Sequence, residues 1–174
     1  MTGDTCQPVS VSRTIEVPAE LLFDFLAHPG NHSLIDGSGM LRKSSGGVIC
    51  GVGDVFTMTM HNDEMGDYEI ANHVVEYEPS HRIGWEPVLK AASRREDQAD
   101  IGIRGEHRWI YEFAPLGATS TLVTETYDCT RAPEWLRSAV KGGTRWIDSM
   151  TATLEKLDAL SRLLPGPAVA TEIK

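Results

Sequence analysis

The sequence predicts an α+β fold in which an antiparallel β-sheet packs against one long C-terminal helix. Apolar residues recur at intervals of three and four between Pro133 and Leu164, which is the spacing of one helix face. Short alternating segments separated by turns fill the chain between Met40 and Cys129. Connections this short favour antiparallel pairing of neighbouring strands. Because no second helical pattern has comparable length, the apolar stripe must be buried against the sheet.

The N-terminal elements follow from alternation and from prolines. Residues Val9–Val17 alternate between apolar and polar side chains, which predicts a half-buried strand with Arg13 as the one charged member of the apolar row. Pro18 suits the first turn of a short helix. That helix ends at His28-Pro29, because the residue before a proline avoids the α conformation. A second helical turn is expected over residues 31–35.

The middle of the chain is predicted to form strands and turns. Its strand-like segments are Met40–Ser45, Asp54–His61, Tyr68–Tyr77, Arg82–Leu89, Glu106–Ala114 and Thr119–Cys129. Together with the first strand they make a sheet of about seven strands. Residues 91–105 are rich in charged side chains and are expected to form a solvated loop.

The C-terminal helix is expected between two prolines. Pro133 fits the first helical position and Pro165 ends the pattern. The pair Gly142-Gly143 has low helix propensity and indicates a kink, the close approach of a ligand, or close packing on the sheet. We expect one domain over residues 8–164 and a flexible tail over residues 165–174.

Composition excludes several classes of function. The 174 residues carry a net charge of −9, so repulsion from phosphate groups argues against nucleic acid as a partner. No apolar stretch is long enough for stable membrane insertion, and the N-terminus lacks the pattern of a secretory signal, so a cytoplasmic location is expected. The three cysteines lie far apart and are expected to be free thiols. A homodimer is left open.

Five stretches carry a resemblance to a known family. They are Ile15–Leu26, Val74–Pro87, His107–Pro115, Thr121–Asp128 and Trp146–Leu157. These stretches and the order of elements resemble the helix-grip fold of the START-like (SRPBCC) superfamily, and in particular its bacterial polyketide cyclase/dehydrase proteins. The resemblance covers roughly residues 8–163. It implies a curved sheet that wraps the C-terminal helix and encloses a pocket for an apolar or amphipathic small molecule. Members share this architecture rather than one active site.

Aromatic and methionine side chains are the candidates for the lining of such a pocket. In the row His107, Trp109, Tyr111 and Phe113, large rings alternate with residues of the opposite face. Rings with polar tips give both contact area and hydrogen bonds, and methionines adapt to ligand shape. The candidate ligand-binding residues are Met58, Met60, Trp85, Trp109, Tyr111, Phe113, Tyr127 and Trp146. The alternative is that these side chains fill an ordinary core.

Glu125 is the candidate acid or base. It shares a strand face with Val123 and Tyr127, and a carboxyl group in an apolar pocket would have a raised pKa. One hypothesis is that Glu125, with His107 or Tyr127, polarises a carbonyl group of the ligand. The alternative is an outward Glu125 that pairs across the strands with Arg108.

Metal and cofactor chemistry are not expected, because the six histidines form no HExxH motif and the cysteines no CxxC pair. The first functional hypothesis is the binding of a lipid, polyketide or other hydrophobic small molecule by a carrier or sensor. The alternative is a cyclase/dehydratase-type enzyme that uses the acid–base residues of the pocket without metal. An interaction module with a filled pocket is a third possibility.

Overall fold

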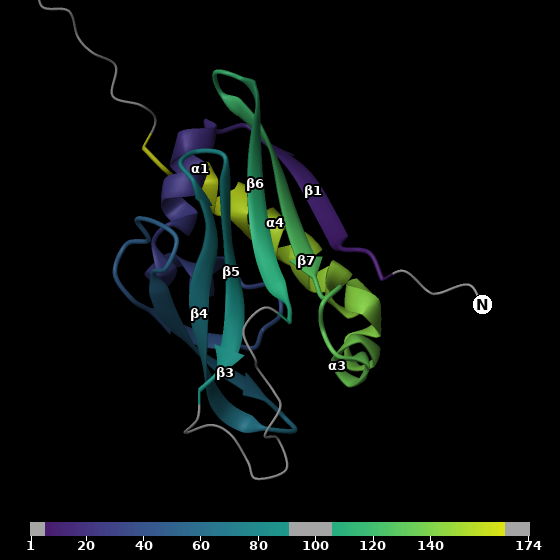
Figure 1. Cartoon of the computed structure of the whole chain (residues 1–174). Helices are drawn as coiled ribbons and strands as arrows, with labels where there is room; N and C mark the ends of the chain where they lie inside the picture. Colours follow the sequence, from purple (N-terminus) through teal and green to yellow (C-terminus); the bar gives the residue numbers. More distant parts are fainter. Residues whose placement is uncertain (1–5, 91–105, 166–174) are drawn as a thin grey trace, which may run out of the picture.

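Seven antiparallel strands form one sheet in a computed structural model that describes residues 6–90 and 106–165 (Figure 1). The order across the sheet is β1-β7-β6-β5-β4-β3-β2. The strands are β1 (Val9–Ile15), β2 (Leu41–Ser45), β3 (Val55–Asn62), β4 (Gly66–Glu78), β5 (Arg82–Leu89), β6 (Arg108–Gly117) and β7 (Ser120–Asp128). The predicted α+β class and the number of strands are confirmed. Consecutive strands from β2 to β7 are neighbours, as their short connections predict.

The helices gather on one face of this sheet (Figure 1). They are α1 (Ala19–Leu26), η1 (Pro29–Asn31), α2 (His32–Ile35), α3 (Glu134–Ala139), η4 (Lys141–Trp146) and α4 (Ile147–Ser161). Helix α4 crosses the sheet near β1 and β7 and also contacts α2. Its buried face includes Met150, Leu154 and Leu157, which are at most 1% exposed. The part of the apolar stripe that lies on α4 is therefore buried against the sheet and α2, whereas α3 has no buried residue.

The long C-terminal helical segment is present, and it is kinked at the Gly142-Gly143 pair, one of the alternatives that this pair indicates. The chain forms α3 and α4 as separate helices, with η4 between them. Gly142 and Gly143 adopt φ values of 63° and 96°, a left-handed conformation that glycine reaches without strain. A Cβ atom at Gly143 would lie 3.1 Å from both Tyr127 and Val9. Both the left-handed conformation and the close approach to β1 and β7 require glycine at position 143, so the helix breaks where the chain packs on the sheet.

Arg13, the charged residue in the first apolar row, has a partner on the C-terminal helix. Its Nε donates a 2.9 Å hydrogen bond to Oδ2 of Asp158, which also pairs with Arg162. The Asp158 side chain is only 10% exposed, and removing one member of such a pair leaves a poorly hydrated charge. Arg13 thus joins β1 to α4 at a position where the sequence pattern alone suggests a misplaced charge.

Two predictions fall outside the residues that the structure describes. They concern the loop 91–105 and the tail 165–174, of which only Pro165 is described. Within the described ranges, no helix combines the length and the apolar character needed to cross a membrane.

Candidate functional site

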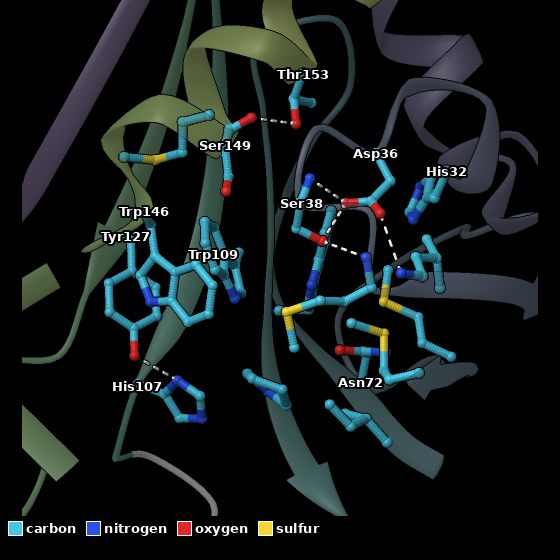
Figure 2. A pocket seen from close by; sticks show the side chains of 18 of the residues that line it. His32, Asp36, Ser38, Asn72, His107, Trp109, Tyr127, Trp146, Ser149 and Thr153 are labelled. Carbon is cyan, nitrogen blue, oxygen red and sulfur yellow. Dashed lines mark hydrogen bonds between the residues drawn. The ribbon is translucent and has the colours of Figure 1, made fainter. Parts of the chain in front are cut away.

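A cavity of about 290 Å³ lies between the sheet and the helical layer. Strands β2 to β7 supply one wall, and the end of α1, α2, the segment after it, α3, η4 and α4 supply the rest. Figure 2 shows His107, Trp109, Tyr127 and Trp146 gathered on one side, and His32, Asp36 and Asn72 on the other. The volume is close to the lower end of the range typical of small-molecule pockets.

Most of the predicted binding residues meet at this cavity. Those in its lining are Met58, Met60, Trp85, Trp109, Tyr111, Tyr127 and Trp146. Phe113 is not among them: it is buried in the core against Phe23, with ring centroids 5.9 Å apart. It shares the inward face of β6 with Tyr111, but it lies farther along the strand, where α1 covers the sheet.

The aromatic lining forms two groups of rings. In one, Trp109 lies 4.6 Å from Tyr127 and 6.0 Å from Trp146, measured between ring centroids. In the other, Trp85 stacks on His32 at 5.2 Å and on Tyr111 at 5.8 Å. Rings that hold one another in this way give the cavity walls of defined shape.

Glu125 points inward and is 4% exposed. Its pKa is raised to about 8, chiefly by burial in the apolar lining; a hydrogen bond with Tyr111, directly opposite on β6, acts against this, and the nearby charge of Asp36 adds to the rise. The alternative pairing with Arg108 is wrong, because Arg108 bonds to Glu76 and Asp128 instead. Glu125 is therefore mostly a neutral acid at pH 7, and its Oε2 has no hydrogen-bond partner among the described residues.

His107 and Tyr127 form a separate pair. The Nδ1 atom of His107 and the hydroxyl oxygen of Tyr127 are joined by a hydrogen bond of 2.9 Å. Burial lowers the pKa of His107 to about 4 and raises that of Tyr127, so both side chains are uncharged at pH 7. Among the described residues, Glu125 forms no hydrogen bond with either of them; its polar neighbour is Tyr111.

Three polar residues of the lining were missed by sequence reasoning. His32 donates from Nε2 to the carbonyl oxygen of Leu26 at 2.7 Å, which leaves Nδ1 as an acceptor without a partner. Burial lowers the pKa of His32 to about 4. Asn72, 1% exposed, has no acceptor for its Nδ2 in the described part of the chain. In the sequence, Asn72 is distinguished only as a polar residue within the apolar row of Tyr68, Ile70 and Val74.

Asp36, also missed, lies in the turn that docks on α4. Its carboxylate accepts hydrogen bonds from the backbone and hydroxyl of Ser38 and from the backbone of Leu41, at 2.7 to 3.0 Å. The backbone N–H of Gly37 donates to Oγ1 of Thr153 at 3.0 Å, which fixes this turn against the helix. No local pattern in the sequence shows that a turn after α2 contributes to the cavity.

The titratable side chains of the cavity do not form a metal site. In residues 6–90 and 106–165, no three His, Cys, Asp or Glu side chains converge in the way that metal ligands do. The lining can therefore supply hydrogen bonds, apolar contact and one neutral carboxylic acid.

Comparisons with known proteins bear on the fold. No family model matches the chain. The uncharacterized protein Rv0088 of Mycobacterium tuberculosis is 32% identical over 146 residues, which are 81% of this chain and 54% of that protein. This chain thus spans about half the length of the curated relatives that it matches.

Solved structures share nearly the whole architecture. Protein Ms6760 of Mycobacterium smegmatis has a TM-score of 0.63 at 14% identity, covering 92% of this chain and 93% of that one. The Polyketide_cyc-like protein Cgl2372 of Corynebacterium glutamicum has a TM-score of 0.52 at 21% identity, covering 90% of each chain. The chain has the helix-grip fold. The resemblance seen in the sequence is confirmed at this level, and identities this low carry the fold alone.

Proposed function

We propose that this helix-grip protein binds a hydrophobic or amphipathic small molecule, such as a lipid or polyketide, in its cavity and acts as a carrier or sensor. The observation that carries the proposal is the cavity of about 290 Å³, with its lining of rings, methionines and few polar groups. Natural pockets for small molecules combine apolar walls with a small number of placed polar atoms. The description of the Corynebacterium protein Cgl2372 as Polyketide_cyc-like agrees with this class of ligand.

Apolar burial supplies part of the expected affinity. A ligand that buries roughly 300 Å² of apolar surface gains about 7.5 kcal/mol at ~25 cal/mol per Å². A Kd of 1 μM corresponds to about 8.2 kcal/mol, and immobilising the ligand costs part of the gain. Hydrogen bonds from the polar residues of the lining must therefore contribute if binding is to reach this range.

Native mass spectrometry of the purified protein tests for a ligand that co-purifies with it. Titration with a panel of fatty alcohols, fatty acids and aromatic polyketides, followed by calorimetry, tests binding directly. The variant Met60→Trp places a large ring in the cavity lining and should abolish binding, whereas Leu116→Trp adds the same ring at a position that is 59% exposed. If no ligand co-purifies and none of the panel binds, the proposal is wrong.

A second candidate is an enzyme of the cyclase or dehydratase kind. The observation that favours it is Glu125, a buried acid beside the hydroxyl of Tyr111, since a carboxyl group with a pKa near neutrality can both give and take a proton. Cyclisation of a linear polyketone needs a proton removed from carbon and another given to a carbonyl oxygen. This addition keeps the mass, and elimination of the new hydroxyl with a proton from the neighbouring carbon then releases one water. A short linear polyketone incubated with the protein should therefore lose water by mass spectrometry, and Glu125→Gln should stop this. An unchanged rate in that variant would exclude Glu125 from the chemistry.

We further propose that residues 8–164 form one domain. The support is a shared core: residues from β1, α1, β4, β7 and α4 belong to one buried cluster. Thermal unfolding followed by far-UV and near-UV circular dichroism should then show one coincident transition. Two separate transitions would contradict a single domain.

A further inference from the structure

We propose that the cavity selects an uncharged ligand that carries a hydroxyl or carbonyl group, and that it rejects anions such as fatty-acid carboxylates. This inference rests on the proposed function, because it assumes that the cavity binds a small molecule. It goes further by naming the chemistry of the polar part of the ligand.

The charges of the lining are the first argument. Among the described residues, the lining contains no lysine and no arginine. It does contain two carboxyl groups, those of Asp36 and Glu125. The two histidines of the lining, His32 and His107, are neutral at pH 7 because burial lowers the pKa of each to about 4. An anionic group placed here would lose its hydration and meet no positive charge in return.

Open hydrogen-bonding atoms are the second argument. Oε2 of Glu125, Nδ2 of Asn72 and Nδ1 of His32 have no partner within the described ranges, and all three side chains are at most 4% exposed. They belong to β7, β4 and α2, three separate elements of the cavity wall. Buried polar groups in native proteins are normally satisfied, so three open atoms around one cavity indicate a partner that enters it.

The chemical types of these atoms define the partner. The Asn72 amide donates, the His32 ring nitrogen accepts, and the neutral Glu125 acid does both. A hydroxyl group can also donate and accept, and a carbonyl group can accept from Asn72 or Glu125. An ammonium group has donors only, and the side chain of Asp36 already accepts three hydrogen bonds from Ser38 and Leu41.

Three ligands with the same chain and different head groups test this inference. They are 1-decanol, 1-decanesulfonate, which stays anionic, and decylamine, which is cationic at pH 7. Calorimetric titration of the full chain, below the concentration at which the ligands aggregate, should give the tightest binding for decanol. The other two should bind about tenfold or more weakly, which corresponds to ~1.4 kcal/mol.

The pH dependence of decanol binding tests the part played by Glu125. Other titratable groups of the same cavity are His32, Asp36, Tyr68, His107, Tyr111 and Tyr127. Burial lowers the pKa of both histidines to about 4, so they stay neutral from pH 7 to pH 9. Burial also raises the pKa of each of the three tyrosines from its ordinary value. In this range Glu125 loses its proton, and ligand entry, which removes water from the cavity, favours the neutral acid over the carboxylate. Decanol affinity of the wild type should fall about tenfold from pH 7 to pH 9, and that of Glu125→Gln should stay constant.

The outcomes separate this inference from the proposed function. If the sulfonate or the amine binds as tightly as decanol, the inference is overturned while ligand binding itself stands. If decanol affinity does not change with pH in the wild type, Glu125 is not part of the selection. If none of the three binds and no ligand co-purifies, the proposed function fails. Met60→Trp, with its control Leu116→Trp, shows whether the measured binding takes place in the cavity.

Discussion

Replacing Glu125 by Gln should stabilise the folded protein at alkaline pH. Burial raises the folded-state pKa of Glu125 from its ordinary 4.5 to about 8, so the folded protein holds a proton that the unfolded chain releases. Stability therefore falls as the pH rises from about 4.5 to about 8, by about 1.4 kcal/mol per pH unit. Over this interval of roughly 3.5 pH units the loss is about 5 kcal/mol, and the glutamine variant does not suffer it.

Urea denaturation of both proteins at pH 4.5, 6, 7 and 9, followed by circular dichroism, measures this difference. Near pH 4.5 the two free energies of unfolding should agree within about 1 kcal/mol, since glutamine and the neutral acid are similar in shape and hydrogen bonding. The difference should then grow with pH and level off above pH 8. All other titratable groups are common to both proteins, so their contributions cancel. A difference that stays constant with pH would show that Glu125 is ionised in the folded protein and would refute the assignment.

Three further predictions concern the rest of the fold. Gly143→Ala should lower the free energy of unfolding by about 2–3 kcal/mol, because it adds a clash to a positive φ, whereas Gly142→Ala, with open space around its Cβ, should cost about 1 kcal/mol; urea denaturation compares them. His107→Gln should reduce the loss of stability as the pH falls from 6.5 to 4, since the folded-state pKa of His107 is lowered to about 4 while the unfolded chain takes up the proton; an unchanged pH profile would contradict this. Exposed Cys50 should react with Ellman's reagent faster than Cys129, which is buried and has a pKa raised to about 11; equal rates, resolved in single-cysteine variants, would count against the structure.

Much of the fold was predictable because strand faces alternate with a period of two. The inward position of Glu125 followed from sharing parity with Val123 and Tyr127, and the structure buries all three. The alternative, an ion pair between Glu125 and Arg108, was based on the position of the two residues on neighbouring strands. The register of β6 and β7 excludes this pair, because Arg108 lies opposite Asp128 and Glu125 lies opposite Tyr111.

The sequence marks the break in the C-terminal helix only by the Gly142-Gly143 pair, which left three alternatives open. An apolar pattern with helical spacing continues across Gly142 and Gly143, and it reports which residues are buried but not whether the backbone between them is continuous. The deciding contact, that of Gly143 with Tyr127 and Val9, joins three distant parts of the chain. No local pattern encodes such a contact.

The polar residues of the cavity were missed for a related reason. His32 follows a short 3-10 turn, and its place beside Trp85 depends on a contact between residues that lie far apart in the sequence. Asp36 reaches the cavity because Gly37 docks on α4. Only Asn72, a polar residue in an apolar row of its strand, left a signal in the sequence.

The pairing of β1 with β7 has a consequence for how the protein is made. Val9 lies opposite Tyr127 and Ile15 opposite Thr121, so the first strand is hydrogen-bonded to a segment more than a hundred residues later. Contacts of such long sequence separation slow folding. During synthesis on the ribosome, β1 must wait for its partner strand until Tyr127, opposite Val9, has been translated. The cavity is complete only after that, once α4 with its lining residues Ser149, Met150 and Thr153 has followed.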